Sequence, residues 1–179
     1  MIKVAKWLSL AALGLLAACE SYNPVDIVVK KEVPPCPKVV LLGDAAKLTK
    51  FRTGSGRDIT DIDIEAEFTG FRGVCDYKEK EGKGTFLMTV SPIVDVSRGA
   101  ANRNGMAEFI YFAAIPEQAK EIFAAKTAFP PNVSKIRFAE DVLEFAVPLK
   151  SGERGENITI YLGFQLNSDQ LEYNRRQGR

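Results

Sequence analysis

The sequence predicts an all-β fold: a single β-sandwich of about seven strands, immunoglobulin-like in the broad sense, followed by a short C-terminal helix or turn. From residue 38 onward, apolar residues recur mainly at every second position, which is the period of a strand with one buried face. Turn-forming residues separate these runs at short intervals, as in sandwich proteins. The Cys-Trp-Cys core of a true immunoglobulin domain is missing, because Trp7, the only Trp, precedes this region.

The composition excludes several classes of function. The 179 residues include 24 Lys+Arg, 23 Asp+Glu and no His. The ordinary apolar share excludes a disordered chain, and the balanced charge excludes the basic excess of nucleic-acid-binding proteins. Without His, the chain has no Ser-His-Asp triad, no Cys-His dyad and no His-ligated zinc site. We therefore expect no catalytic activity, no cofactor, no metal and no nucleic-acid partner.

The amino terminus has the three parts of a secretory signal. Lys3 and Lys6 precede an apolar run at residues 7–18, which ends in small residues before Cys19. The run has 12 residues, whereas a helix needs about 20 to cross a bilayer. We therefore interpret residues 1–18 as a cleaved signal peptide.

Leu16-Ala17-Ala18-Cys19 resembles the lipobox of bacterial lipoproteins. The resemblance implies that the thiol of Cys19 is diacylated, that the signal is cut just before it, and that the new amino group is acylated too. Two or three acyl chains anchor a protein stably. In this family an aspartate after the cysteine favours the inner membrane, and Glu20 stands there instead, so the resemblance implies the periplasmic leaflet of the outer membrane. An ordinary signal peptide is the alternative.

Residues 19–35 are expected to form a lipidated tether that contains Pro24, Pro34 and Pro35. At about 3.1 to 3.5 Å per residue, it would hold the domain up to roughly 50 Å from the bilayer. The short apolar run at residues 25–29 leaves open whether part of this segment docks on the domain as an edge strand.

Cys36 and Cys75 are the cysteines that remain once Cys19 is lipidated. A secreted chain enters an oxidising compartment, so we expect these two to form a disulfide. The closed loop has 40 residues, for which the chain-entropy model gives about 4 kcal/mol of stabilisation. The alternatives are a metal pair and redox-active thiols, but two thiolates without His make a poor zinc site and the spacing is not C-x-x-C.

Strands in the first half of the domain are predicted at residues 38–42, 62–68, 74–77 and 85–96. A polar stretch, residues 43–58, follows the first, and a hairpin turn at residues 78–84 precedes the last. Pro92 predicts a break or bulge in the last strand, because proline has no backbone N–H to donate to a neighbouring strand in the middle of a sheet.

In the second half, Asn104-Gly105 predicts a hairpin turn. It introduces the strand at residues 106–115, whose run Phe109-Ile110-Tyr111-Phe112 is apolar on both faces and predicts a mid-sheet position. Alanines in residues 121–129 suit a helix, whereas the Ile, Phe and Thr there suit a strand, which we favour. Strands at residues 143–149 and 158–166, with a turn at 151–156, complete the predicted domain, residues 36–166.

The tail, residues 167–179, begins with Asn167 as a helix N-cap and Gln170 three residues later. We expect a short helix or turn that covers one end of the sandwich. Arg175 and Arg176 form a basic patch for phosphate or acidic glycan in one interpretation and a solvated, frayed terminus in the other, which we favour. Residues 162–166, just before the tail, are similar to the ends of some uncharacterised proteobacterial envelope lipoproteins.

The loop at residues 97–103 is the best exposed candidate for contacting a partner. It carries Arg98, Asn102 and Arg103, and scaffolds commonly display function on loops.

An acidic strand offers a second candidate site. Its acids alternate with apolar residues and are Asp61, Asp63, Glu65 and Glu67. Same-face carboxylates two residues apart lie about 6.6 Å apart at the backbone, a spacing that inverting glycosidases use. A general acid needs a raised pKa and therefore burial, whereas this face points away from the core. We favour a solvated face that pairs with nearby lysines, namely Lys78, Lys80 or Lys83.

Taken together, these features predict a lipid-anchored cell-envelope protein that acts as a structural or protein-interaction module in the periplasm. Its expected partners are the membrane, through Cys19, and an envelope protein. The alternative is a protein that binds or hydrolyses peptidoglycan or another glycan with the acidic strand face.

Overall fold

The computed structural model describes residues 33–54, 56–118, 120–139, 142–151 and 153–178. The predicted signal peptide, Cys19 and the predicted tether up to residue 32 lie outside the described residues. Within the described residues, we find no helix with the length and apolar character needed to span a bilayer.

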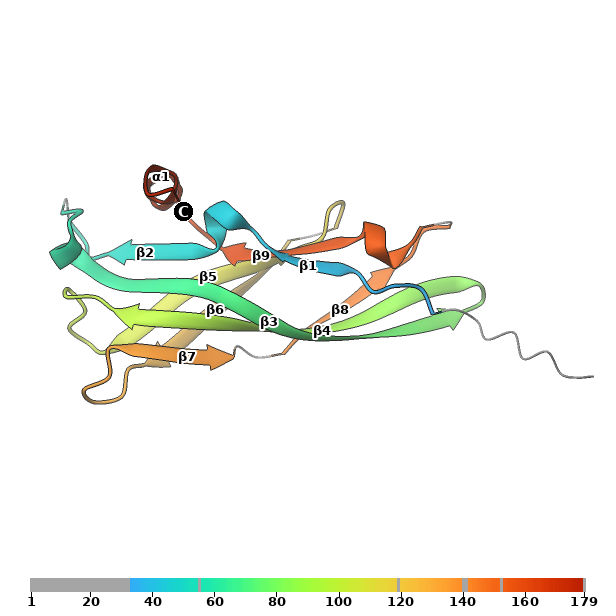
Figure 1. Ribbon diagram of the computed structural model, residues 1–179, viewed down its shortest axis with the longest axis horizontal. Helices are drawn as coiled ribbons and strands as arrows, with labels where there is room; N and C mark the ends of the chain where they lie inside the picture. The colour runs from blue at the N-terminus through green and yellow to red at the C-terminus, as the bar shows by residue number, and fades with distance from the viewer. Residues whose placement is uncertain (1–32, 55, 119, 140–141, 152, 179) are drawn as a thin grey trace, which may run out of the picture. The chain divides into compact units, whose positions relative to one another are not determined.

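Nine strands, three short 3-10 turns and one α-helix make up the described part of the chain (Figure 1). The strands are β1 (Lys38–Leu41), β2 (Lys47–Phe51), β3 (Ile62–Lys80), β4 (Lys83–Arg98), β5 (Met106–Ala114), β6 (Glu121–Ala128), β7 (Lys135–Ala139), β8 (Leu143–Pro148) and β9 (Thr159–Phe164). The 3-10 turns are η1 (Gly43–Ala45), η2 (Ile59–Asp61) and η3 (Gly155–Asn157), and the helix is α1 (Ser168–Arg176).

The strands form two sheets. The four-stranded sheet has the order β1-β9-β5-β6, in which β1 is parallel to β9 and the other neighbours are antiparallel. The five-stranded sheet has the order β2-β3-β4-β7, and β8 also pairs with β4. The predicted all-β sandwich with a short C-terminal helix is therefore confirmed.

The hydrophobic core lies between the two sheets and is built from alternate residues of their strands. Phe68 of β3 packs on Phe164 of β9 and Tyr111 of β5, with ring centroids 4.4 and 6.0 Å away. Other fully buried side chains are Ile64, Phe86, Val90, Val94, Val96, Val147, Ile160 and Leu162. The period of two in the sequence thus separates inward from outward positions correctly.

The structure contains two strands that the sequence did not predict, β2 and β7. The interpretation of residues 43–58 as a polar stretch was wrong, because β2 lies within it. Both strands pair with one neighbour in their sheet and span only five residues; among the described side chains, Leu48 of β2 lies in the core and Ile136 of β7 packs against it. Too few inward positions exist in such short edge strands for a periodic pattern to stand out.

Residues 121–128 form strand β6, as we favoured, and β4 continues through Pro92 without a break. The register shift near Pro92 lies in β3, between Phe68 and Gly70. On the other edge of β4, the pairing with β8 ends at Val90 and the pairing with β7 begins at Ile93. Pro92 therefore falls where β4 changes neighbours, so a central strand tolerates it.

The prediction of a hairpin at Asn104-Gly105 was wrong. The turn is present, and Gly105 has the positive φ of 68° that it requires. However, β4 before it belongs to the five-stranded sheet and β5 after it to the four-stranded sheet. The turn carries the chain from one sheet to the other, which a local turn signal does not distinguish from a hairpin.

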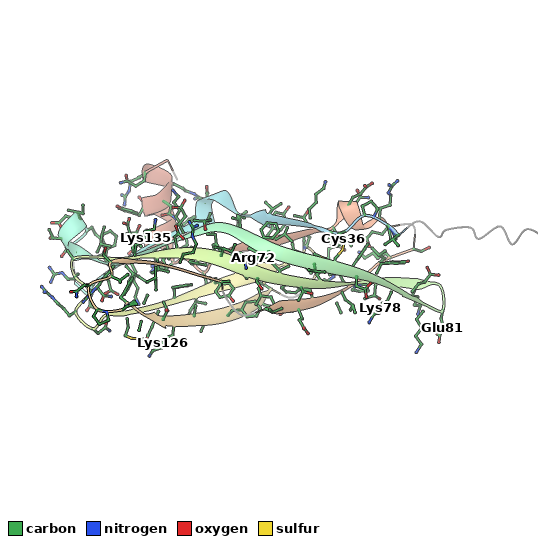
Figure 2. All side chains as sticks on the ribbon, turned by 60° about the horizontal axis from the view of Figure 1, so that its bottom comes forward. Cys36, Arg72, Lys78, Glu81, Lys126 and Lys135 are labelled. Carbon is green, nitrogen blue, oxygen red and sulfur yellow. A yellow bond between two sulfur atoms is a disulfide. The ribbon has the colours of Figure 1, made fainter. Side chains whose placement is uncertain are left out.

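Cys36 and Cys75 form a disulfide, as predicted, with their Cα atoms 6.3 Å apart. Cys36 lies two residues before β1 of the four-stranded sheet, and Cys75 lies in β3 of the five-stranded sheet. The covalent bond therefore ties the two sheets together (Cys36 is labelled in Figure 2).

The predicted capping box begins helix α1: the side chain of Asn167 accepts from the Gln170 amide, and that of Gln170 accepts from the Asn167 amide. The helix lies beside η1 and β2 (Figure 1). Buried Asn174 fixes it there by donating from Nδ2 to the carbonyls of Asp44 and Lys47 at 3.0 and 2.8 Å. The favoured interpretation of the tail as a frayed terminus was therefore wrong for the described residues.

Candidate interaction surface

The outer face of the five-stranded sheet is crossed by a row of charged residues, in which two neighbouring acids are flanked by a basic residue on each side. The register places Lys47 beside Glu67, Glu67 beside Asp95, and Asp95 beside Arg137, on strands β2, β3, β4 and β7. Lys47 pairs with Glu67 at 3.0 Å, and Arg137 donates two hydrogen bonds to Asp95 at 2.5 and 2.9 Å. Lys135 adds a third contact to Asp95 at 3.3 Å.

These contacts shift the pKa values of Asp95 and Arg137. The hydrogen bond from Arg137, followed by that from Lys135, holds the pKa of Asp95 below its ordinary value, although partial burial opposes this. The same hydrogen bond raises the pKa of Arg137. The row is therefore a set of neutralised ion pairs, whereas a general acid requires a carboxyl group with a raised pKa.

The structure does not bring the four predicted acids together on one strand face. Asp61 lies before β3 in turn η2, where its buried carboxylate accepts from Arg52 at 2.5 Å and from the Asp58 amide at 3.3 Å. A Cβ at Gly56 would lie 2.1 Å from this carboxylate, so the loop packs directly on it. Asp61 therefore stabilises the turn, and the assignment of this residue to the acidic face was wrong.

The predicted partners of the acidic strand were also wrong. Glu67 pairs with Lys47 of β2, and Lys50 of β2 lies 4.0 Å from Asp63. The three predicted lysines belong to the β3–β4 hairpin beyond this region. Figure 2 shows one of them, Lys78, toward the hairpin end of the sheet, at the opposite end from Lys135 of the charged row. The edge strand β2, which the sequence did not predict, supplies the cations instead.

Part of the loop at residues 97–103 is held by hydrogen bonds within the domain. Asn102 is buried; its Nδ2 donates to Asp63 and to the Met106 carbonyl at 3.0 and 2.8 Å, and its Oδ1 accepts from the Gly105 amide. Arg98 and Arg103 are exposed, and Arg98 donates to the Asn102 carbonyl at 3.0 Å. Asn102 is therefore a structural residue, and its selection as a partner-contact residue was wrong.

The C-terminal arginines are held in ion pairs on α1. Arg175 contacts Asp44 at 3.0 Å and Arg176 contacts Glu172 at 3.2 Å. A groove of about 360 Å³ lies between α1 and β2, and its walls include Phe51 and Tyr173, whose rings meet edge to face at 5.3 Å. The groove wall also contains both acidic and basic residues, Asp169 and Glu172 against Lys50, Arg57 and Arg176, and Arg176 is paired with Glu172, so the groove is not a strongly basic phosphate site.

The outer face of the four-stranded sheet differs from the charged row because it is apolar. We call it the apolar face and define it by Val40, Leu42, Ile110, Phe112, Ile122 and Tyr161. The aliphatic side chains are 40 to 57% exposed, and the two aromatic ones are half-buried. Their neighbours in each strand alternate with them and point into the core.

The strand register makes the apolar face continuous. Tyr161 lies between Val40 and Ala114, and Phe112 lies between Gly163 and Ile122. A Cβ at Gly163 would lie 3.2 Å from the Phe112 ring and 2.9 Å from Ala45, so this ring spreads over a glycine beside η1. The side chains of four neighbouring strands thus form one surface.

Two lysines at the apolar face have contacts within the chain. Lys126 pairs with Glu108 at 2.6 Å, and this contact lowers the pKa of Glu108. Lys120 donates to Gln165 at 2.8 Å, and its ammonium lies 5.0 Å from the centroid of the Phe112 ring. The surface is therefore apolar with a polar rim of low net charge.

The sequence analysis did not predict the apolar face, although the sequence contains a pattern that indicates it. The run Phe109-Ile110-Tyr111-Phe112 is apolar on both faces and predicts a mid-sheet strand, and this position is confirmed by β9 and β6 on its two sides. Its outer residue Ile110 is 47% exposed, however. An antiparallel strand that is apolar on both faces fits either a covered sheet or an interaction surface, and the sequence alone does not separate them.

The described residues contain no group of three or more acidic, Cys or His side chains arranged to hold a metal ion. Comparisons of the chain with protein-family models, with curated proteins and with solved structures found no match.

Proposed function

We propose that this protein is a lipid-anchored component of the bacterial cell envelope whose β-sandwich acts as a protein-interaction or structural module. The observation that carries the interaction role is the apolar face. In an antiparallel sandwich of a monomeric protein, outward-facing positions are normally polar. Contiguous exposed apolar surface with a polar rim marks an interaction site.

A partner on this face would remove apolar surface from water. Val40, Leu42, Ile110 and Ile122 each retain roughly half of their accessible surface. Covering the remainder contributes about 1 kcal/mol per side chain, or about 4 kcal/mol in all, before the costs of association. On the other sheet, a partner would have to desolvate the ion pairs of Asp95 and Glu67, which gains little.

The anchoring part of the proposal rests on the resemblance of Leu16-Ala17-Ala18-Cys19 to a lipobox. It places the protein on the periplasmic leaflet of the outer membrane, with an envelope protein as partner. A glycan-active protein is less well supported, because Asp61 and Glu67 are both engaged in ion pairs with cations of the same chain.

Metabolic labelling with an alkyne analogue of palmitate tests the anchor. We expect the full-length chain to carry the label in the membrane fraction and the Cys19→Ala variant to lose it. A wild-type chain without label would contradict the lipid anchor and would leave the interaction role to be judged separately.

Photo-crosslinking in living cells tests the interaction role. A photoreactive residue is placed at Ile122 on the apolar face or, as a matched control, at Val142, which precedes β8 of the other sheet and is equally exposed, 56% against 57%. We expect a discrete protein adduct from position 122 and none from position 142. Failure to obtain any protein adduct from position 122 would contradict the proposal.

A further inference from the structure

We propose that the groove between α1 and β2 binds a small zwitterion, with Arg57 on the carboxylate of the ligand and Asp169 on its ammonium group. The groove has a volume of about 360 Å³, which is within the range of small-molecule sites. It lies at the five-stranded sheet, whereas the apolar face belongs to the four-stranded sheet. The site is therefore distinct from the surface of the interaction role proposed above.

The walls of the groove come from three parts of the chain. Strand β2 supplies Phe51, the loop that follows it supplies Arg57, and helix α1 supplies Asp169 and Tyr173. The helix lies beside β2 (Figure 1), where the two hydrogen bonds of Asn174 hold it. The groove is thus formed before a ligand binds, which lowers the cost of binding.

Most charged side chains of the groove already have a partner. Arg176 pairs with Glu172 at 3.2 Å, and Lys50 donates to a backbone carbonyl of β5 at 3.3 Å. Arg57 and Asp169 differ from them: within the described residues, neither forms an ion pair, with the other or with a third residue. One cation and one anion of the groove therefore remain open to a ligand of complementary charge.

The guanidinium group of Arg57 is held in place and keeps donors for a carboxylate. Its Nη1 donates to the carbonyls of Gly54 and Gly56 at 2.9 and 2.7 Å. No acceptor for its Nε or Nη2 is found among the described residues. Arg137 uses these same two nitrogens to hold both oxygens of Asp95, at 2.5 and 2.9 Å. A ligand carboxylate can be held by Arg57 in the same bidentate way.

Two aromatic rings give the groove an apolar wall. Phe51 and Tyr173 meet edge to face, with their centroids 5.3 Å apart, and the Arg57 guanidinium lies 5.4 Å from the centroid of the Phe51 ring. Both rings are half-buried, so part of their surface is available to the body of a ligand. An inorganic anion or a metal cation would satisfy one open charge and neither ring. A ligand with both charges and an apolar body, such as an amino acid or a short peptide, satisfies all of them.

Binding of two zwitterions to the full-length protein in detergent tests the proposal. Phenylalanine and the dipeptide alanylphenylalanine carry the same charges and the same ring, so the tighter of the two distinguishes an amino-acid site from a peptide site. Ligand-observed NMR over a concentration series measures the dissociation constants. We expect saturable binding of at least one probe, with a dissociation constant of about 1 mM or below.

Blocked forms of the tighter probe test the role of each charge. Acetylation removes the ammonium charge and amidation removes the carboxylate charge. Each change should weaken binding to the wild-type protein at least about fivefold, because a charge-assisted contact is lost.

Two variants assign each charge to its residue. With Asp169→Asn, acetylation should weaken binding by less than about twofold, whereas amidation should keep its full effect. With Arg57→Gln, the two effects should be exchanged. Asp76→Asn and Arg103→Gln remove the same charges from exposed positions that do not line the groove, so they should leave all affinities unchanged. Retention of the Cys36–Cys75 disulfide, measured by alkylation without reductant, shows that the variants still fold.

The proposal would be overturned if neither probe saturated the wild-type protein at about 10 mM. It would also be overturned if the doubly blocked probe bound as tightly as the zwitterion, or if both variants kept the full effect of both blocking groups, because the charges would then be bound elsewhere. These results leave the proposed function untouched, since crosslinking at Ile122 tests the apolar face by itself.

Discussion

The amide of Asn102 connects three points of the chain, since it bonds to Asp63, to the Met106 carbonyl and to the Gly105 amide. It thereby fixes the crossing from β4 to β5, where the chain changes sheets. In sequence it appears in a loop between two arginines and two glycines, which is why an exposed contact residue was expected there. Whether a loop asparagine binds a partner or its own backbone depends on the distant Asp63, which the local sequence does not place.

Replacing Asn102 with Ala should therefore destabilise the protein. The change leaves the partly buried Met106 carbonyl and Gly105 amide without their side-chain partner, at a cost of about 2 kcal/mol in the free energy of unfolding. Urea denaturation followed by circular dichroism measures it. The exposed neighbour Arg103 is the control, and Arg103→Ala should change the free energy by less than about 0.5 kcal/mol. Equal effects of the two substitutions would contradict the structural role.

Asp95 makes the stability of the protein depend on acid pH. Its ion pair with Arg137 lowers its pKa in the folded state, so the unfolded chain binds a proton at a higher pH than the folded chain does. The stabilisation is fully present at neutral pH and is lost as the pH falls below about 4, through the folded-state pKa.

The Asp95→Asn variant should be less stable than the wild type at pH 7 and should lose less stability between pH 5 and pH 2. Thermal unfolding at a series of pH values measures both differences. Glu144→Gln is the control, because Glu144 is an exposed residue of β8 and the substitution also removes one carboxylate. If Asp95→Asn retained the full acid dependence of the wild type, the ion pair would not be its source.

At the scale of elements, α1 is a cover for the edge of the five-stranded sheet. Strand β2 is the outermost strand of that sheet, and an uncovered edge exposes unpaired backbone groups. Asn174 of α1 binds the Lys47 carbonyl on this edge, and Tyr173 packs on the Phe51 ring. The helix itself was predictable from its capping box, whereas its docking was not, because β2 has no clear sequence pattern.

Substitution of Asn174 with Ala should loosen this helix. The partly buried hydrogen bonds to the carbonyls of Asp44 and Lys47 are lost, so we expect the free energy of unfolding to fall by about 2 kcal/mol. Hydrogen exchange should show faster exchange in residues 168–176 than in the core strands. Gln177→Ala, an exposed position at the end of the same helix, is the control. Unchanged exchange in α1 would show that Asn174 does not hold the helix.

At the scale of the whole molecule, the Cys36–Cys75 disulfide links the two sheets at one edge of the sandwich. Replacing both cysteines with Ser should lower the free energy of unfolding by about 4 kcal/mol in the chain-entropy model, because the unfolded chain loses a closed loop of this length. The midpoint of urea unfolding measures the change. Wild-type protein kept in reductant should match the variant. A variant as stable as the oxidised wild type would show that the bond contributes little.

The sequence by itself determined the features that depend on neighbouring residues. The lipobox resemblance, the expected anchor and the capping box of α1 are all local patterns, and the strongly alternating strands follow from the period of two. The sandwich and the disulfide were also predictable, because alternation defines one buried face and the expected export of the chain to an oxidising compartment predicts that Cys36 and Cys75 pair.

Only the tertiary structure decided which distant residues meet. Edge strands β2 and β7 span only five residues each, so their sequences carry little periodic signal, yet β2 supplies the cations that neutralise Glu67 and approach Asp63. The crossing at Asn104-Gly105 depends on which sheet each strand joins. The apolar face depends on what covers the outer side of β5 and β6, and exposure is a property of the packed molecule rather than of any one strand.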